Sequence, residues 1–223
     1  KGVEMDKYFN TRFSYDKRRE IVWKVICKFL ERYIDINDVV VDIGAGYCDF
    51  INNVKAKGKY AVDLYDDFKY YANSDIETFV GYCTNLYFFE ANFFDVVFSS
   101  NLLEHLTLQQ IMQTLKEFNR VLKQNGKLIL LLPNFKYCYK KFYDDYTHIT
   151  PLTEYSICDI LKAQGFEILR VFPKFLPFSL KSKFPASTFL VKLYLVLPIK
   201  LFAGQMLIIA KKMGNKNVER QNC

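Results

Sequence analysis

The chain has 223 residues, of which 51% are hydrophobic, and this length and composition suit one α/β domain with a substantial core. Its 21 Phe and 16 Tyr are many for this length, so some of them are expected at the surface as a binding face. The net charge of +7 comes with lysines spread along the chain rather than in a dense block, which argues against a nucleic-acid partner. Two interpretations of the charge stay open, a generic basic surface and attraction to an anionic partner.

Several features of the sequence favour a cytoplasmic protein. The first forty residues contain no uninterrupted apolar run of the kind a signal peptide needs. The most apolar late segment, 186–203, is interrupted by Lys192, Pro198 and Lys200, whereas a spanning helix needs about 20 mostly apolar residues. The six Cys show no C-x-x-C spacing and there are two His, so we expect reduced cysteines and no metal site.

The first half of the chain alternates between helical and strand patterns. Apolar residues recur at helical spacing after Asp16, a plausible N-cap, and short apolar runs of strand length follow. Gly44-Ala45-Gly46 separates the first such run from the next helix, which we expect to end near Gly58. In chain order we expect a helix over 16–33, a strand over 39–43, a helix over 47–57, and strands over 60–64, 79–82 and 95–99.

The second half continues the alternation. Thr107 and Gln110 form a capping-box pattern at the start of the clearest helix, and Gly126 stands where its C-terminal stop belongs. We expect a helix over 107–124, a strand over 127–132, a helix over 153–163, and strands over 166–171 and 206–210.

Strands that alternate with helices predict a doubly wound, mostly parallel sheet with helices on both faces. No linker divides the chain, so we expect a single domain. We divide it into an N-terminal helical lid (1–34), a cofactor-binding core (35–172), an acceptor-side insertion (173–204), the last strand (205–211) and a tail (212–223).

The glycine turn and the next strand together predict a nucleoside ligand. In an open α/β sheet, ligands bind at the carboxyl ends of the strands, where Gly44 and Gly46 allow the backbone to approach closely. Asp63 ends the following strand and can accept both hydroxyls of a ribose. A dinucleotide fingerprint would place a third glycine at Asp49, whose carboxylate would also meet a pyrophosphate. S-adenosylmethionine, which has no phosphate, fits better than a nicotinamide or flavin cofactor.

These motifs, in this order, resemble those of class I S-adenosylmethionine-dependent methyltransferases. The resemblance rests on 42–46, Asp63, 94–106 and 122–128, and it covers 39–171. Segments 8–19, 44–52 and 175–182 are similar to a bacterial subgroup often encoded among polysaccharide-biosynthesis enzymes.

The resemblance implies a Rossmann-like seven-stranded sheet whose last strand is antiparallel, with S-adenosyl-L-methionine as cofactor. The sequence departs from the family in one place, because no acidic residue for the adenine amino group follows the third strand. The implied cofactor contacts are Gly44, Ala45 and Gly46 for the amino-acid end, Asp63 and Leu64 for the ribose, Tyr82 and Cys83 for adenine, Ser100 and Asn101 beside the sulfonium, and Tyr8 and Arg12 from the lid.

Methyl transfer to an oxygen benefits from a general base, and the chain offers few candidates. His148 lies in a polar loop after the fifth strand, so it is a base candidate, with a solvated loop histidine as the alternative. His105 is expected to shape the cofactor loop instead. Tyr143 and Asp145 of the same polar loop are candidate substrate contacts.

The segment 173–204 is the unusual part of the chain, because Phe and Lys alternate along it. A lid, a homodimer contact or an acceptor-binding segment are all compatible with it. In the last case Lys181 holds phosphate of a nucleotide- or lipid-linked sugar, and 193–201 lies along a membrane interface.

The leading hypothesis is methyl transfer to a hydroxyl of a small acceptor, a sugar or glycan precursor. The alternatives are N-methylation of an amino sugar or other amine, a cofactor-binding partner protein without catalysis, and a dehydrogenase, which Asp49 disfavours.

Overall fold

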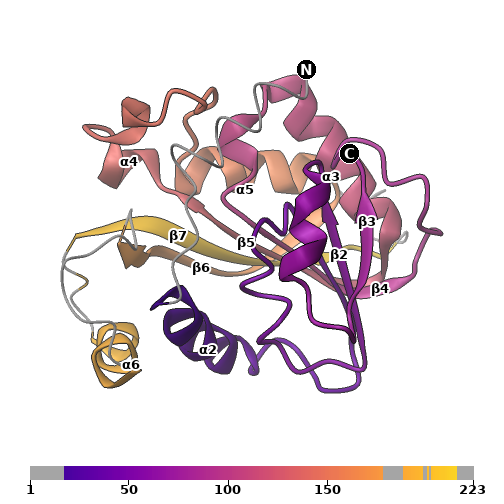
Figure 1. Cartoon of the computed structure of the whole chain (residues 1–223). Helices are drawn as coiled ribbons and strands as arrows, with labels where there is room; N and C mark the ends of the chain where they lie inside the picture. Colours follow the sequence, from indigo (N-terminus) through magenta and orange to yellow (C-terminus); the bar gives the residue numbers. More distant parts are fainter. Residues whose placement is uncertain (1–17, 178–187, 198–199, 201, 215–223) are drawn as a thin grey trace.

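A computed structural model describes residues 18–177, 188–197, 200 and 202–214 of the chain. Its centre is a seven-stranded sheet with the strand order β3-β2-β1-β4-β5-β7-β6 (Figure 1). The strands are β1 (Val39–Ile43), β2 (Gly58–Asp63), β3 (Glu77–Val80), β4 (Phe94–Ser100), β5 (Leu122–Pro133), β6 (Phe166–Pro177) and β7 (Ala203–Lys212).

The directions of the strands confirm the expected sheet. β1 pairs in parallel with β2 on one side and with β4 on the other, so that Val41 lies opposite Tyr60 and Val97. β7 is antiparallel to both β5 and β6. The chain leaves β1 toward one edge of the sheet and returns to the other side of β1 at β4. This change of direction creates the crevice in which open α/β sheets bind ligands.

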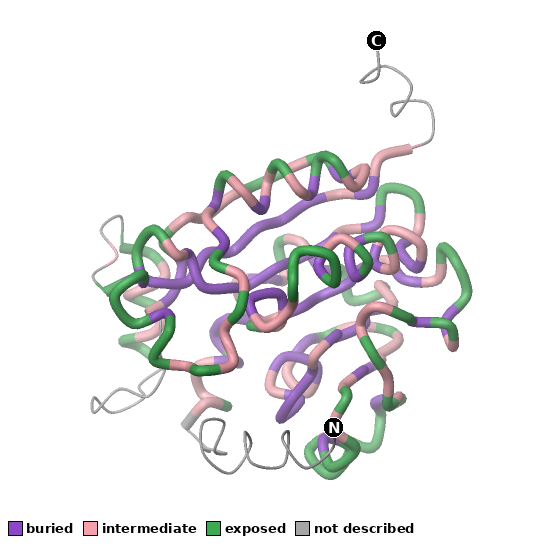
Figure 2. Tube along the Cα trace, turned by 90° about the horizontal axis from the view of Figure 1, so that it is seen from above, coloured by how far each residue is buried: buried purple, intermediate pink, exposed green. Residues whose placement is uncertain are grey.

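Helices cover both faces of the sheet (Figure 1). α3 (Leu108–Val121) and α5 (Glu154–Ala163) pack on one face, and α2 (Arg18–Leu30) packs on the other, with α6 (Thr188–Val196) beside α2. Successive strand residues point to opposite faces, so Val40 joins the core under α2 while Val41 joins the core under α3. Figure 2 shows the resulting buried strands between more exposed helices. The shorter helices are α4 (Phe135–Cys138) and the 3-10 turns η1 (Asp66–Tyr71), η2 (Leu103–His105) and η3 (Phe142–Asp144).

The start of α3 was predicted correctly and its end was not. Thr107 and Gln110 form the expected capping box, which satisfies backbone donors at the helix start. The helix ends at Val121, and β5 begins at the next residue, so Gly126 lies inside a strand rather than at a helix stop. Asn125, with φ of 63°, takes the left-handed conformation that was expected of the glycine.

The helix predicted over 47–57 is absent, which is a correction to the sequence interpretation. The chain there forms separate turns, such as those closed by Cys48 N–H to Ala45 O and Asn52 N–H to Cys48 O. The positive φ angles of Gly46 (53°) and Cys48 (56°) interrupt the run of right-handed residues that a helix needs. Phe50 and Ile51 are still buried under the sheet, so their apolar spacing reflects core packing rather than a helix.

The other boundaries differ by smaller amounts. The expected N-cap Asp16 lies outside the described residues, and the helix that follows ends at Leu30 rather than 33. β6 continues to Pro177 and β7 begins at Ala203, so both ends of the segment expected as an insertion are strand. A described helix, α6, lies between these two strands.

Candidate cofactor and acceptor site

The glycine turn follows β1 and is held against β2. The N–H groups of Gly44 and Ala45 donate to the carbonyl of Val62 over 2.9 and 3.1 Å. Gly44 has φ of 79°, and a Cβ there would lie 3.3 Å from the side chain of Leu102. A glycine at this position therefore allows both the turn and the close approach of the segment after β4.

Asp63 stands at the end of β2 and braces this turn. Its carboxylate accepts hydrogen bonds from the N–H of Gly46 over 2.8 Å and of Tyr65 over 2.9 Å. Burial raises the pKa of Asp63, while the backbone donors act in the opposite direction. An ionised carboxylate has about four lone-pair sites, so Asp63 retains acceptor capacity for ribose hydroxyls. Leu64, the next residue, is exposed.

Asp49 is engaged in an ion pair that the sequence did not reveal. The guanidinium of Arg19 in α2 lies 2.7 Å from its carboxylate. Burial raises the pKa of Asp49, and the charge of Arg19 opposes that rise. The pair ties α2 to the turn after β1. It also compensates part of the negative charge that was expected to repel a pyrophosphate, so Asp49 argues less strongly against a dinucleotide than its position in the sequence indicates.

The end of β4 contributes the polar residues that were expected beside the sulfonium. The hydroxyl of Ser99 donates to the carbonyl of Ile43 over 2.8 Å and links β4 to β1. Asn101, with φ of 50°, donates from its amide to the hydroxyl of Ser100. Its amide oxygen accepts from Gln205 of β7 over 3.1 Å. Gln205 was missed by sequence reasoning because β7 becomes a neighbour of β5 only through the sheet order.

The segment expected near adenine is anchored by α3. Cys83 is half-buried, and the hydroxyl of Thr114 lies 3.4 Å from its sulfur. Tyr82 is exposed. The guanidinium of Arg120 donates to the carbonyls of Leu86 and Phe89 over 2.8 Å each. These bonds fix the loop after β3 in place.

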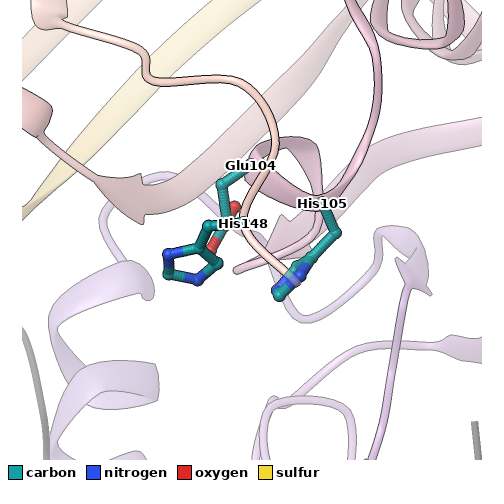
Figure 3. A group of neighbouring side chains, drawn as sticks. All are labelled: Glu104, His105 and His148. Carbon is teal, nitrogen blue, oxygen red and sulfur yellow. The ribbon is translucent and has the colours of Figure 1, made fainter. Parts of the chain in front are cut away.

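Both histidines of the chain lie together beyond the ends of β4 and β5 (Figure 3). Their ring centroids are 4.9 Å apart. The Nδ1 atom of His148 is 2.7 Å from the carbonyl oxygen of Phe142. The ring centroids of His148 and Phe142 are 4.5 Å apart. Burial, followed by the neighbouring charge of His148, lowers the pKa of His105 to about 4. The sequence placed His148 in this loop but did not predict that His105 lies beside it.

Asp145 supports this pair through Thr147. The Asp145 carboxylate accepts from the N–H of Thr147 over 3.0 Å and from its hydroxyl over 2.6 Å. The same hydroxyl lies 2.9 Å from Nδ1 of His105. Burial would raise the pKa of Asp145, but the Thr147 bonds and the two histidines lower it below the ordinary value. Tyr143, the other substrate candidate of this loop, is exposed and packs its ring edge on Phe142.

Glu104 is the functional candidate that sequence reasoning missed. It is 2% exposed, and among the described residues neither of its carboxylate oxygens has a hydrogen-bond partner. Burial raises its pKa to about 8. Its backbone carbonyl accepts from the N–H groups of Ile149 and Thr150, which joins the segment after β4 to the histidine loop. The Glu-His pair at 104–105 was the available signal, but in the sequence it stands out only as part of a longer motif.

Three of the predicted site residues cannot be placed. Tyr8, Arg12 and Lys181 lie outside the residues that the structure describes.

Comparison with known proteins gives a family match over part of the chain. Residues 41–130 match the family model described as methyltransferase domain. No curated protein sequence matches the chain.

Solved structures share the fold over most of their length. An S-adenosylmethionine-dependent methyltransferase from Archaeoglobus fulgidus is 21% identical, with a TM-score of 0.62, over 85% of this chain and 94% of its own. One from Thermotoga maritima is 18% identical, with a TM-score of 0.66, over 94% of this chain and 95% of its own. One from Methanosarcina mazei is 17% identical, with a TM-score of 0.60, over 83% of this chain and 97% of its own. At these identities the likeness shows the fold, which is that of class I methyltransferases.

The family match and the fold together support an S-adenosylmethionine-dependent methyltransferase, and S-adenosylmethionine is the cofactor that they imply. The glycine turn, the carboxylate of Asp63 and the polar end of β4 fit the parts of this cofactor. Within the described residues, no helix combines the length and the apolar character that crossing a membrane requires.

Proposed function

We propose that the chain transfers the methyl group of S-adenosylmethionine to a hydroxyl of a small acceptor, a sugar or a glycan precursor. The observation that carries this proposal is the arrangement of His148. It lies beside the segment that follows β4, where the reactive end of the cofactor is expected, and its ring is oriented by a backbone carbonyl.

The hydrogen bond of His148 selects its tautomer. A carbonyl oxygen only accepts, so the Nδ1 atom facing Phe142 carries the proton and Nε2 carries the lone pair. In the proposed reaction the acceptor oxygen attacks the methyl carbon, the carbon–sulfur bond breaks, and the hydroxyl proton passes to Nε2 of His148. General base catalysis of this kind contributes about 10²–10⁴-fold. An amine arrives deprotonated and does not need this base, which is why the arrangement favours a hydroxyl.

The remaining site residues take the roles expected from the sequence. Gly44, Ala45 and Gly46 hold the amino-acid end, and Asp63 binds the ribose with Leu64 beside it. The proposed adenine neighbours are Tyr82 and Cys83, the sulfonium neighbours are Ser100 and Asn101, and the lid contributes Tyr8 and Arg12. Alignment of acceptor and methyl group can lower the barrier by about 7–11 kcal/mol.

An aromatic and basic surface near the histidine loop supports a phosphate-bearing sugar as the acceptor. The ammonium of Lys174 lies 4.5 Å from the ring centroid of Tyr137, and that of Lys136 lies 5.5 Å from it. Tyr143 is exposed in the same loop region and, with Asp145, is proposed to contact the acceptor. Tyrosine rings offer apolar faces to sugars, while the lysines, with Lys181, attract phosphate.

α6 supports a peripheral membrane contact of the kind a lipid-linked acceptor would require. Its residues Phe189, Leu193 and Val196 are exposed although the helix is mostly apolar. An exposed apolar helix of this kind can lie in a membrane interface or meet another copy of the chain.

The test has two parts. Calorimetry should show binding of S-adenosylhomocysteine to the isolated protein, and NAD should not bind. A panel of nucleotide sugars with free hydroxyl or free amino groups should then yield methylated product from the hydroxyl acceptors. Transfer only to amines, with His148→Ala as active as the parent, would establish N-methylation instead.

A further inference from the structure

Glu104, His105 and His148 form a cluster of potential metal ligands, shown together in Figure 3. One ligand atom from each side chain lies within 4.8 Å of those of the other two. The residues come from η2, after β4, and from the loop after η3. Backbone hydrogen bonds from Ile149 and Thr150 to the carbonyl of Glu104 hold these two segments together.

Both imidazoles are held in the same tautomer. Nδ1 of His148 faces the carbonyl of Phe142 at 2.7 Å and therefore carries a proton. Nδ1 of His105 faces the hydroxyl of Thr147 at 2.9 Å, and that hydroxyl already donates its proton to Asp145. The Thr147 oxygen must then accept from His105. In both rings Nε2 carries the lone pair, and metal-binding histidines typically have this support on their other nitrogen.

The carboxylate of Glu104 is the second, independent observation. It is 2% exposed and, within the described part of the chain, its two oxygens lack hydrogen-bond partners. Leaving a buried carboxylate without compensation is costly, whereas a cation beside it removes the cost. The neighbours of this carboxylate in the cluster are two imidazoles rather than a lysine or an arginine.

We propose that Glu104, His105 and His148 bind a divalent transition-metal cation of the Zn²⁺ type. Two imidazoles and one carboxylate are a known ligand set for zinc that leaves a position open for a small molecule. Ligands about 2.0–2.2 Å from zinc lie about 3–3.5 Å apart, so ligand atoms that now lie within 4.8 Å of one another need to approach by up to about 1.3–1.8 Å. Mg²⁺ prefers an all-oxygen shell and is expected to bind far more weakly.

This site differs from the sequence expectation of no metal, which rested on cysteine spacing and the small number of histidines. The cation would occupy the same Nε2 lone pair to which a proton is assigned in the proposed function. A cation held there would therefore compete with the proton for this nitrogen. The binding itself does not depend on the proposed reaction, because it needs neither cofactor nor acceptor.

The chain has two histidines, which makes the site directly observable by NMR. In ¹⁵N-labelled protein the two imidazole rings should both show the Nδ1–H tautomer. Titration with Zn²⁺ should shift the Nε2 resonances of both rings together and saturate at one equivalent. Titration with Mg²⁺ at the same concentration should leave them in place. Zinc shifts in neither ring, or in one alone, would overturn the proposal.

Variants separate this site from adventitious binding to cysteines. Glu104→Gln should bind Zn²⁺ at least about 100-fold more weakly, and Thr147→Val about 10–100-fold more weakly, as an outer residue does. Asp159→Asn, which alters an exposed carboxylate on α5, is the matched control and should bind as the parent does. Co²⁺ should give a spectrum without the thiolate charge-transfer band. A thiolate band, or zinc affinity unchanged in Glu104→Gln, would contradict the assignment.

A thermal measurement keeps the test independent of folding defects. Without metal, Glu104→Gln should melt at or above the temperature of the parent, because the amide replaces an unpaired buried carboxylate. Zn²⁺ should raise the melting temperature of the parent, through linkage, and not that of the variant. An equal zinc-induced rise in both proteins would refute the site. If the parent protein does not bind S-adenosylhomocysteine, the proposed function is contradicted, but the metal site is not.

Discussion

Two carboxylates of the candidate site, the half-buried Asp63 after β2 and the buried Glu104 after β4, differ in how their oxygens are hydrogen-bonded. At the cofactor end, Asp63 accepts hydrogen bonds from the backbone of Gly46 and Tyr65. At the acceptor end, the oxygens of Glu104 have no partner among the described residues. Burial raises the pKa of both groups, and backbone donors counteract this rise more fully at Asp63.

The half of the site around Asp63 is therefore preorganised, whereas the half around Glu104 still lacks a partner for its carboxylate among the described residues. The half proposed for the cofactor is built from short turns whose backbone groups already donate to the carboxylate of Asp63, so we expect a nucleoside to bind there without rearrangement. The acceptor half orients two imidazoles through Phe142 and Thr147 and leaves a carboxylate unpaired beside them. Such a group is complete only with a proton, a cation or a substrate bound. Variants in the two halves should therefore fail in different ways.

The largest effect is expected at His148. His148→Ala should reduce turnover by about 10²–10⁴-fold, because the acceptor hydroxyl loses its proton acceptor. The affinity for S-adenosylhomocysteine should stay within about twofold of the parent, measured by calorimetry. Turnover within about threefold of the parent would remove His148 from the reaction.

A change at Asp63 should instead affect the affinity for the cofactor. Asp63→Ala should weaken S-adenosylhomocysteine binding by about 1.5–3 kcal/mol, the contribution of a hydrogen bond to a charged group. Asp63→Asn is the comparison variant, because its single amide oxygen can accept from the N–H of Gly46 or of Tyr65 but not from both. Binding restored in Asn would show that one acceptor oxygen at this position is sufficient, whereas equal losses in Asn and Ala would show that the carboxylate is required.

The raised pKa of Asp42, near the end of β1, should be visible in how the free energy of unfolding depends on pH. Burial, followed by the charges of Asp63 and Asp49, raises its pKa well above the ordinary value. Above the ordinary carboxyl range the folded state still holds a proton that the unfolded state has released. The free energy of unfolding should therefore fall by up to about 1.36 kcal/mol for each pH unit, until the pH passes the raised pKa of the folded state. Asp42→Asn should flatten this fall in urea titrations at several pH values. An unchanged slope would mean that Asp42 titrates normally.

The hydrogen bond between β4 and β1 should have a smaller effect. Ser99→Ala removes the donor to the carbonyl of Ile43 and should lower the free energy of unfolding by about 0.5–1.5 kcal/mol. Denaturant unfolding measures this directly. Ser100→Ala is a suitable comparison, because Ser100 accepts from the exposed Asn101 amide and should matter less for stability.

The smallest effect on stability is expected at α6. Phe189→Ser and Val196→Ser alter exposed side chains, so the free energy of unfolding should change by no more than about 0.5 kcal/mol. If α6 contacts a membrane, both variants should sediment less with anionic liposomes than the parent. If sedimentation is unaffected but self-association decreases, the helix is a contact between copies of the chain.

Local patterns were sufficient for the elements whose signals lie within a few residues. The run Val39–Ile43 is apolar over the length of a strand, and it is β1. Thr107 and Gln110 start α3 because a capping box is formed by neighbours in the chain. The stretch 47–57 misled the prediction because buried turns can place apolar residues at helical spacing, and the left-handed Cys48 is invisible in sequence.

By itself the sequence determined the doubly wound fold, the glycine turn and the position of Asp63 at the end of the next strand, because alternating elements and short motifs are encoded in consecutive residues. Tertiary structure alone decided which distant groups meet: Arg19 with Asp49, Gln205 with Asn101, and the two histidines with Glu104. These contacts depend on strand order and on how loops from β4 and β5 approach each other. Only burial in the folded chain leaves the carboxylate oxygens of Glu104 without hydrogen-bond partners among the described residues.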